Sequence, residues 1–243
     1  MEQELWITRL FNSFLAAPAN AVLSAIHHPS HDPVHPWSDW MVCELIVVAI
    51  MLVFFGWVRG RLSVDKPGRT QHTLELAYEF FHASSEEIAG HDGPKYLAFF
   101  GTIFLFILFM NLIGLIPGFD SPTMYPMVPF GLAVATFLFY HASGMRANGF
   151  GYIKQFLGPM LLLAPLMLPI EVISHFARPL SLTVRLFANI FAGEQVYLTF
   201  LSLTKVIIPV IFLGLHLFVG LLQAYIFMML AMVYVGGAIA HDH

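Results

Sequence analysis

Six polar or charged side chains follow one another at helical spacing inside a long apolar region. They are Glu171, Ser174, Arg178, Ser181, Arg185 and Asn189, separated by 3, 4, 3, 4 and 4 residues. On a helix with about 100° per residue, all six fall within about 80° of one another, and leucine, valine, isoleucine and phenylalanine fill the other directions. The pattern predicts one narrow polar line along an otherwise apolar helix.

A second polar line follows in the next apolar run. Its members are Lys205, His216, Gln223 and Tyr234, separated by 11, 7 and 11 residues. Each step returns to within about 20° of the same direction on a helix. Gly214 and Gly220 lie near His216 and leave space for close helix approach or for water. Two lines of ionisable and hydrogen-bonding groups suit a path for protons or small ions across a membrane.

Arginine is the most informative residue type in these lines. At the centre of a membrane span it costs roughly 2.5 to 3.5 kcal/mol on insertion scales, and it does not lose its proton as lysine can. A structural alternative exists for Asn111, Gln223 and Ser181, because each can simply form a hydrogen bond between helices. For Arg185, the structural alternative is an ion pair with a glutamate of its own helix.

The spacing argues against one such pair. Arg185 and Glu194 are nine residues apart, which places them about 180° apart around an ideal helix. We therefore expect Glu194 to face His216 on the neighbouring helix. Arg185 then needs a carboxylate from elsewhere, such as another chain.

Composition defines the class of protein. The chain has 243 residues, of which 58% are hydrophobic and 11% charged, and its mean hydropathy is +0.76. Soluble proteins are about one quarter charged, so this chain is predicted to be an integral membrane protein. A net charge of −4 gives no sign of a nucleic-acid partner, and the single Cys43 excludes an internal disulfide or a CxxC motif. The sequence contains no phosphate loop, GxSxG or HExxH motif, so we expect no enzyme activity, bound ATP, cofactor or metal.

The apolar runs predict an all-α polytopic membrane protein with about five transmembrane helices. Three spans are expected at about 40–58, 97–116 and 127–143, with a helix at the inner surface over 70–90. Two final arms of about 35 to 45 residues exceed the roughly 20 that an upright span needs. We expect them to form a hairpin of long helices that are strongly tilted, kinked or broken at prolines.

The N-terminal region is predicted to differ from the rest. Residues 1–36 are expected to hold an interfacial helix and an outer loop, and residues 37–243 the transmembrane domain. The loop contains four histidines, which we interpret as solvated rather than as a metal site: His27, His28, His31 and His35. The start MEQELW does not resemble a cleavable signal peptide.

The basic residues predict the orientation in the membrane. Seven of the 11 Lys and Arg residues lie in the loops after the first and third spans: Arg59, Arg61, Lys66, Arg69, Lys95, Arg146 and Lys154. By the positive-inside rule, those loops are cytoplasmic. The N-terminus then faces outward and the C-terminus faces the cytoplasm.

Three motifs carry a resemblance to a known family. ARPLSLTVRLFANIFAGE, HLFVGLLQAYIFMMLAMVYV and MNLIGLIPG resemble the signatures of subunit a of F-type ATP synthases, and the likeness extends from about Trp40 to the C-terminus. In that family, subunit a is the stator beside a rotating ring of c subunits. The resemblance implies one upright region and a pair of long, nearly horizontal helices.

The resemblance also implies a role for each polar residue. Arg185 matches the essential stator arginine. Positions lining the half-channel from the outer side match Asn189, Glu194, His216 and Gln223. Positions of the half-channel to the cytoplasm match Glu171 and Ser174, whereas Ser181 and Arg178 match positions with weaker assignments. Asp39 resembles an acidic residue at the outer channel entrance.

The implied function is proton translocation that drives ring rotation and ATP synthesis. The implied partners are the c-subunit ring, the peripheral-stalk b subunits, the rest of the synthase and membrane lipid. Having both Glu194 and His216 favours a bacterial source, hence the inner membrane. Three alternatives stay open: a stand-alone secondary transporter or channel, a Na⁺-coupled version of the same subunit, and a non-transporting membrane scaffold.

Overall fold

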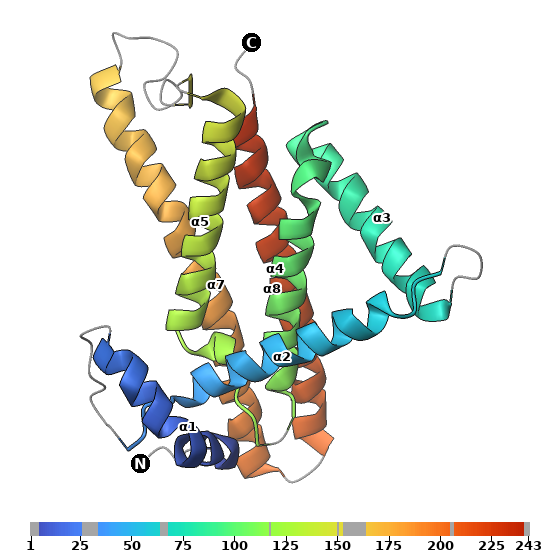
Figure 1. Cartoon of the computed structure of the whole chain (residues 1–243), viewed down its shortest axis with the longest axis vertical. Coiled ribbons are helices and arrows are strands. Elements are labelled where there is room, and N and C mark those ends of the chain that lie inside the picture. The colour runs from blue at the N-terminus through green and yellow to red at the C-terminus, as the bar shows by residue number, and fades with distance from the viewer. Residues whose placement is uncertain are drawn as a thin grey trace.

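The computed structural model describes residues 5–25, 34–63, 68–116, 118–149, 151–152, 164–204 and 207–240. Across these ranges every extended regular element is a helix (Figure 1): α1 (Trp6–Ala25), α2 (Asp39–Arg59), α3 (Arg69–Ala89), η1 (Gly93–Tyr96), α4 (Leu97–Ile113), η2 (Pro122–Met124), α5 (Met127–Asn148), α7 (Ala164–Leu203) and α8 (Ile207–Ile239). Five described helical segments are long and apolar enough to cross a membrane: α2, η1 with α4, α5, α7 and α8. The predicted all-α polytopic fold is confirmed.

The helix α8 is the centre of the bundle. It packs most extensively against α7 and α4, and also against α5 and α3. Its buried residues Met228 and Met232 share one apolar cluster with Phe100 of α4 and Tyr140 of α5. Gly236 lets the end of α3 approach closely, because a Cβ there would lie 2.8 Å from the Cα of Ala89. α8 is thus held against α7, α4, α5 and α3, which brings the polar side chains of these helices close to it.

Helix lengths indicate how the bundle sits in a membrane. α7 has 40 residues and α8 has 33, so they are about 60 Å and 50 Å long, well beyond a hydrocarbon core of about 30 Å. α2 has 21 residues and matches that core at about 31 Å. Figure 1 shows α2 crossing the direction of α8 at a steep angle, so the two cannot both stand upright. The lengths therefore fit α2 as a single crossing of the core and show that α7 and α8 each exceed it, and the strong tilt of the α7–α8 hairpin stays a prediction.

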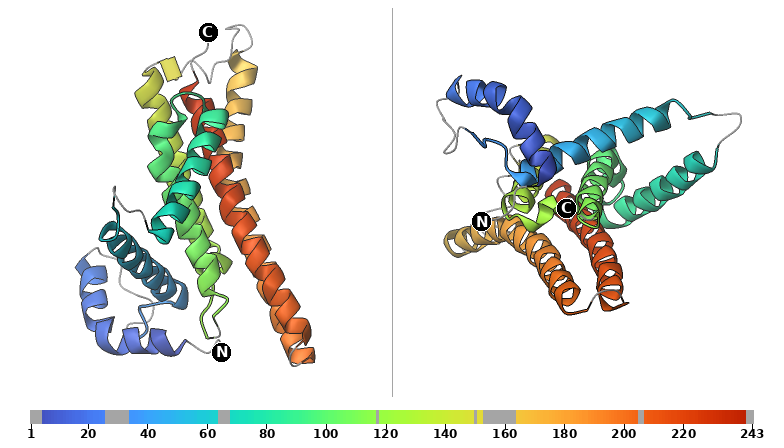
Figure 2. Two further views of the ribbon diagram at one scale, coloured as in Figure 1. Left: turned by 90° about the vertical axis from the view of Figure 1, so that its right-hand side faces the viewer. Right: turned by 90° about the horizontal axis from the view of Figure 1, so that it is seen from below.

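The prolines of the long hairpin do not divide it. α7 continues as one helix through Pro169 and Pro179, so it is not broken in two. α7 and α8 pack against each other, and the right-hand view of Figure 2 shows the C-terminal end of α7 next to the N-terminal end of α8. The hairpin is therefore a pair of antiparallel helices, and residues far apart in sequence face each other along it.

The N-terminal helix is fastened to the start of α2. The buried Asn12 donates from Nδ2 to the Trp37 carbonyl at 3.2 Å and accepts from the Trp37 amide at 3.1 Å. The Leu5 amide donates to Asp39 Oδ1 at 3.2 Å. α1 lies outside the five apolar segments, and its interfacial placement stays a prediction.

The histidine-rich loop falls partly within the described residues. His27, His28 and His31 lie outside them, and His35 is exposed. Among the residues that are described, no group of three His, Cys, Asp or Glu side chains is arranged to hold a metal ion.

A buried polar network joins α4, η2 and α8. Asn111 Nδ2 donates to the Gly220 carbonyl at 2.9 Å, and Thr123 donates to Asn111 Oδ1 at 2.6 Å. Ser121 bonds Thr123 and the Met110 carbonyl. The structural interpretation of Asn111 is confirmed, because its amide joins two helices and bonds a carbonyl of α8 one turn from His216.

Candidate functional site

The polar line on α7 lies at the margin of the helix face that packs against the bundle. Leu182, Leu186 and Ile190 form the buried face. Arg178 and Arg185 are half-buried beside it, whereas three members of the line are exposed: Ser174, Ser181 and Asn189. The line therefore borders a face of α7 that the described part of the chain leaves open.

Arg185 has no partner at that margin within the described part of the chain. Among the residues that the structure describes, it makes no hydrogen bond or ion pair. The prediction that Glu194 is not its partner is confirmed. A half-buried guanidinium without a counter-charge is costly in a membrane, which favours a partner from outside this chain.

Glu194 instead faces His216 on α8, as the spacing predicted. Glu194 Oε2 lies 3.9 Å from His216 Nε2, and the two residues are 9% and 3% exposed. Neither ring nitrogen of His216 has a hydrogen-bond partner among the described residues. A cavity of about 210 Å³ between α7 and α8 is lined by His216, Asn189 and Gly193 among others. The imidazole of His216, which faces the buried Glu194, thus sits beside a space that can hold water.

The glycine that makes room for His216 differs from the one expected. A Cβ on Gly214 would meet no atom within 4 Å, and a Cβ on Gly220 would face Asn111. A Cβ on Gly193 of α7, by contrast, would lie 2.7 Å from His216 Nδ1. The close approach therefore comes from the opposite helix, which a spacing pattern within α8 could not reveal.

Asp120 is a further acid at this end of the bundle. It accepts a hydrogen bond from the Tyr125 hydroxyl at 3.0 Å. It is close enough to act electrostatically on both Glu194 and Cys43, and Asp39 acts on Cys43 as well. Sequence reasoning missed Asp120, although its place in the polar turn after α4 was visible. Asp39 and Asp120 both border Cys43 on the side of the bundle that holds Glu194.

A second cluster of titratable side chains lies toward the N-terminal end of α7, around Glu171. Glu171 Oε1 is 3.4 Å from His175 Nε2, and the Tyr140 hydroxyl is 2.8 Å from His175 Nδ1. The Arg178 guanidinium lies over the rings of Tyr140 and Tyr234, at 5.8 Å and 5.2 Å from their centroids. Sequence reasoning missed His175, although it follows Glu171 by one helical turn.

Arg185 separates these two groups along the hairpin. It is nine residues from Glu194 and 14 from Glu171, or about 13 Å and 21 Å along α7. On α8, the buried Gln223 lies between His216 and Tyr234. Lys205, the remaining member of the second line, lies outside the described residues.

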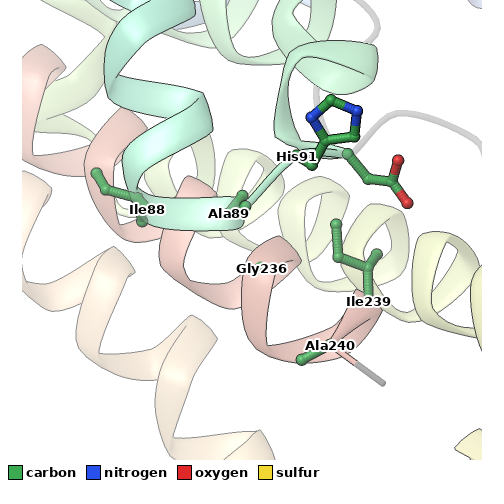
Figure 3. A pocket seen from close by; sticks show the side chains of 8 residues that line it. Ile88, Ala89, His91, Gly236, Ile239 and Ala240 are labelled. Atoms are coloured by element: carbon green, nitrogen blue, oxygen red, sulfur yellow. The ribbon is translucent and has the colours of Figure 1, made fainter.

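A larger cavity lies away from both polar lines. It measures about 520 Å³ between the C-terminal ends of α3 and α8, with Gly236 on its α8 side. Figure 3 shows the His91 side chain at its rim and apolar Ile239 beside it. None of the predicted site residues lines this cavity, so it takes no part in the candidate site.

Fold and site together define a polytopic α-helical membrane protein with ionisable groups inside a long helix hairpin. The sequence profile of the ATP synthase A chain family matches residues 41–236. The chain belongs to the family of ATP synthase subunit a, the non-catalytic membrane subunit of the synthase.

Curated proteins named ATP synthase subunit a are similar to this chain over most of its length. The chain is 56% identical to ATP synthase subunit a of Solibacter usitatus over 96% of this chain and 100% of the relative. It is 48% identical to that of Koribacter versatilis over 100% of both chains. Identity to the Aquifex aeolicus protein is 38%, over 83% of this chain and 97% of the relative.

Proposed function

We propose that this chain is the proton-translocating stator subunit of the synthase membrane sector. Two offset aqueous half-channels reach the carboxylates of a c-subunit ring, and Arg185 separates them. The observation that carries the proposal is the position of Arg185, which has no partner in the described chain and lies between two titratable groups. In the proposed roles, the outer half-channel contains Glu194, His216, Gln223 and Asn189, with Asp39 at its entrance. The cytoplasmic half-channel contains Glu171 and Ser174, and Ser181 belongs to the proton path without assignment to either half-channel.

Electrostatics supplies the mechanism. A rotor carboxylate that faces lipid must be protonated, because the charged form is costly there. Beside Arg185 the opposite charge favours the carboxylate, and the proton leaves. Each charge that crosses the membrane gains about 2.3 kcal/mol per 100 mV, and rotation of the ring passes that energy to a distant catalytic head. The exposed margin of α7 around Arg185 suits this contact, because it is open to a neighbouring chain.

The proposed setting is a bacterial inner membrane. The exposed Arg59 and Arg61 at the end of α2 and Arg146 in the last turn of α5 favour a cytoplasmic position for both loops. The N-terminus is then outside and the C-terminus inside. Peripheral-stalk b subunits complete the proposed partners.

Co-isolation separates this proposal from a stand-alone transporter or channel. We expect the chain to purify from membranes with a ring of small hairpin subunits. Vesicles containing the whole complex are expected to make ATP when the pH gradient is applied, and vesicles with this chain alone are not. Transport by the isolated chain would contradict the stator role, and flux that requires Na⁺ would show the Na⁺-coupled version.

Gly193 gives a test of the packing at the outer half-channel. We expect Gly193→Ala to slow proton-driven ATP synthesis in vesicles about tenfold, since its Cβ would lie 2.7 Å from His216 Nδ1 and would turn the imidazole away from Glu194. Gly214→Ala is the matched control, because a Cβ there meets no atom within 4 Å. Equal rates in the two variants would show that the position of His216 does not matter.

A further inference from the structure

The cytoplasmic end of α7 contains more titratable groups than Glu171 alone. His175 of α7 and His141 of α5 have ring centroids 5.1 Å apart. Each imidazole bonds a tyrosine through Nδ1 at 2.8 Å: His175 bonds Tyr140, and His141 bonds Tyr152. None of these four residues belongs to either polar line of the sequence. Most of the cluster comes from α5 and the short segment after it, so only the fold brings it to Glu171.

Building on the proposed function, we propose that His175 and His141 form a proton relay between Glu171 and the cytoplasm. His175 has the geometry of a relay, since one ring nitrogen faces the Glu171 carboxylate at 3.4 Å and the other bonds Tyr140. A proton leaves Glu171 Oε1 and bonds to His175 Nε2, while Nδ1–H donates to the Tyr140 oxygen. The step converts a neutral acid and a neutral imidazole into a carboxylate and an imidazolium, so charge and protons balance.

The surroundings of His175 limit how long it can keep that proton. The groups that face it or its partner imidazole are Tyr140 and His141 of α5, Tyr152, Glu171 and Arg178 of α7, and Tyr234 of α8. Arg178 is permanently charged, and two adjacent imidazoles disfavour a double charge. The pair therefore holds one proton at a time. The imidazolium of His175 gives its proton to a water, which passes it to the adjacent imidazole of His141. His141 then releases the proton to water on the cytoplasmic side, so both imidazoles return to the neutral form.

Tyr152 fits the role of an anchor for His141, whose Nδ1 it bonds. Burial raises the pKa of its hydroxyl, so the hydroxyl keeps its proton and remains able to bond His141. Gly144 of α5 makes room for it, because a Cβ there would lie 2.5 Å from the Tyr152 ring. Tyr152 follows the end of α5 at Asn148, which places His141 at the side of the cluster nearest the cytoplasmic loop.

The test uses ATP-driven proton pumping by the intact complex in inverted vesicles, where the medium contacts the cytoplasmic face. Glutamine keeps a hydrogen-bonding amide but cannot carry a proton, so His175→Gln separates a relay from a packing role. We expect the pH of half-maximal pumping to fall by about one unit on the cytoplasmic side, as a relay lost at one step would require. The profile measured from the lumen is expected to stay unchanged.

The controls assign each outcome. His91→Gln makes the same change on an exposed histidine of the same region, and we expect wild-type pumping from it. An unchanged profile in His175→Gln would overturn the relay. His141→Gln gives the same readout if His175→Gln does not assemble. Normal pumping by Arg185→Ala would instead refute the proposed stator function, whereas loss there with normal His175→Gln refutes the relay alone.

Discussion

Arg185→Ala is expected to abolish proton-driven ATP synthesis while leaving the complex assembled. A nearby opposite charge lowers a carboxyl pKa by about one to three units. Without the guanidinium, a rotor carboxylate would release its proton about 10 to 1000 times less often at this position. Arg185 has no partner in the described part of the chain, so its removal leaves no buried group unpaired here. We therefore expect normal co-isolation with the ring.

Two further variants make this result specific to the fixed charge. Arg185→Lys keeps a cation that can lose its proton when buried, and we expect it to lose most of the synthesis as well. Arg146→Ala removes an exposed arginine at the last turn of α5 and should synthesise ATP normally. ATP synthesis at the normal rate by Arg185→Ala, measured per assembled complex after an acid–base transition, would refute the proposed role.

Much of the fold could be predicted because apolar runs record membrane spans directly. The first span, expected at about 40–58, is α2 at Asp39–Arg59. The helix expected over 70–90 is α3 at Arg69–Ala89, and its place at the inner surface stays a prediction. Whether the first long arm, α7, is continuous or broken could not be predicted from its prolines. In α7, Pro169 and Pro179 lie inside one continuous helix, since neighbouring packing can hold a helix whose internal hydrogen bonds are interrupted.

The site was predictable only where it depends on one helix or on two helices in a simple hairpin. The helical spacing placed Glu194 on the opposite side of α7 from Arg185. The packing of α7 against α8 then brings Glu194 to within 3.9 Å of His216. His141 and Asp120 were not predictable in this way, because α5 and the turn before η2 meet α7 through tertiary packing. Periodicity reports which face a residue shares, but not which distant element covers that face.

Glu194→Gln is expected to slow proton uptake from the outer side about a hundredfold, at the lower end of what loss of a positioned acid or base costs. The amide has the same shape, so the 9% exposed site stays filled and assembly is retained. The deficit in ATP synthesis should shrink as the outer pH falls, because a higher proton concentration compensates for a missing relay group. Glu79→Gln, an exposed change on α3, is the matched control.

Variants of His216 test whether Glu194 and His216 act as one unit in proton uptake. If they form a single relay, Glu194→Gln, His216→Gln and the double variant should show similar rates, because residues that act together are strongly non-additive. Independent roles would instead multiply the two losses. Proton flux measured at saturating driving force distinguishes the cases, and flux unchanged in Glu194→Gln would remove this carboxylate from the outer path. The contact across α7 and α8 at 3.9 Å favours the single relay.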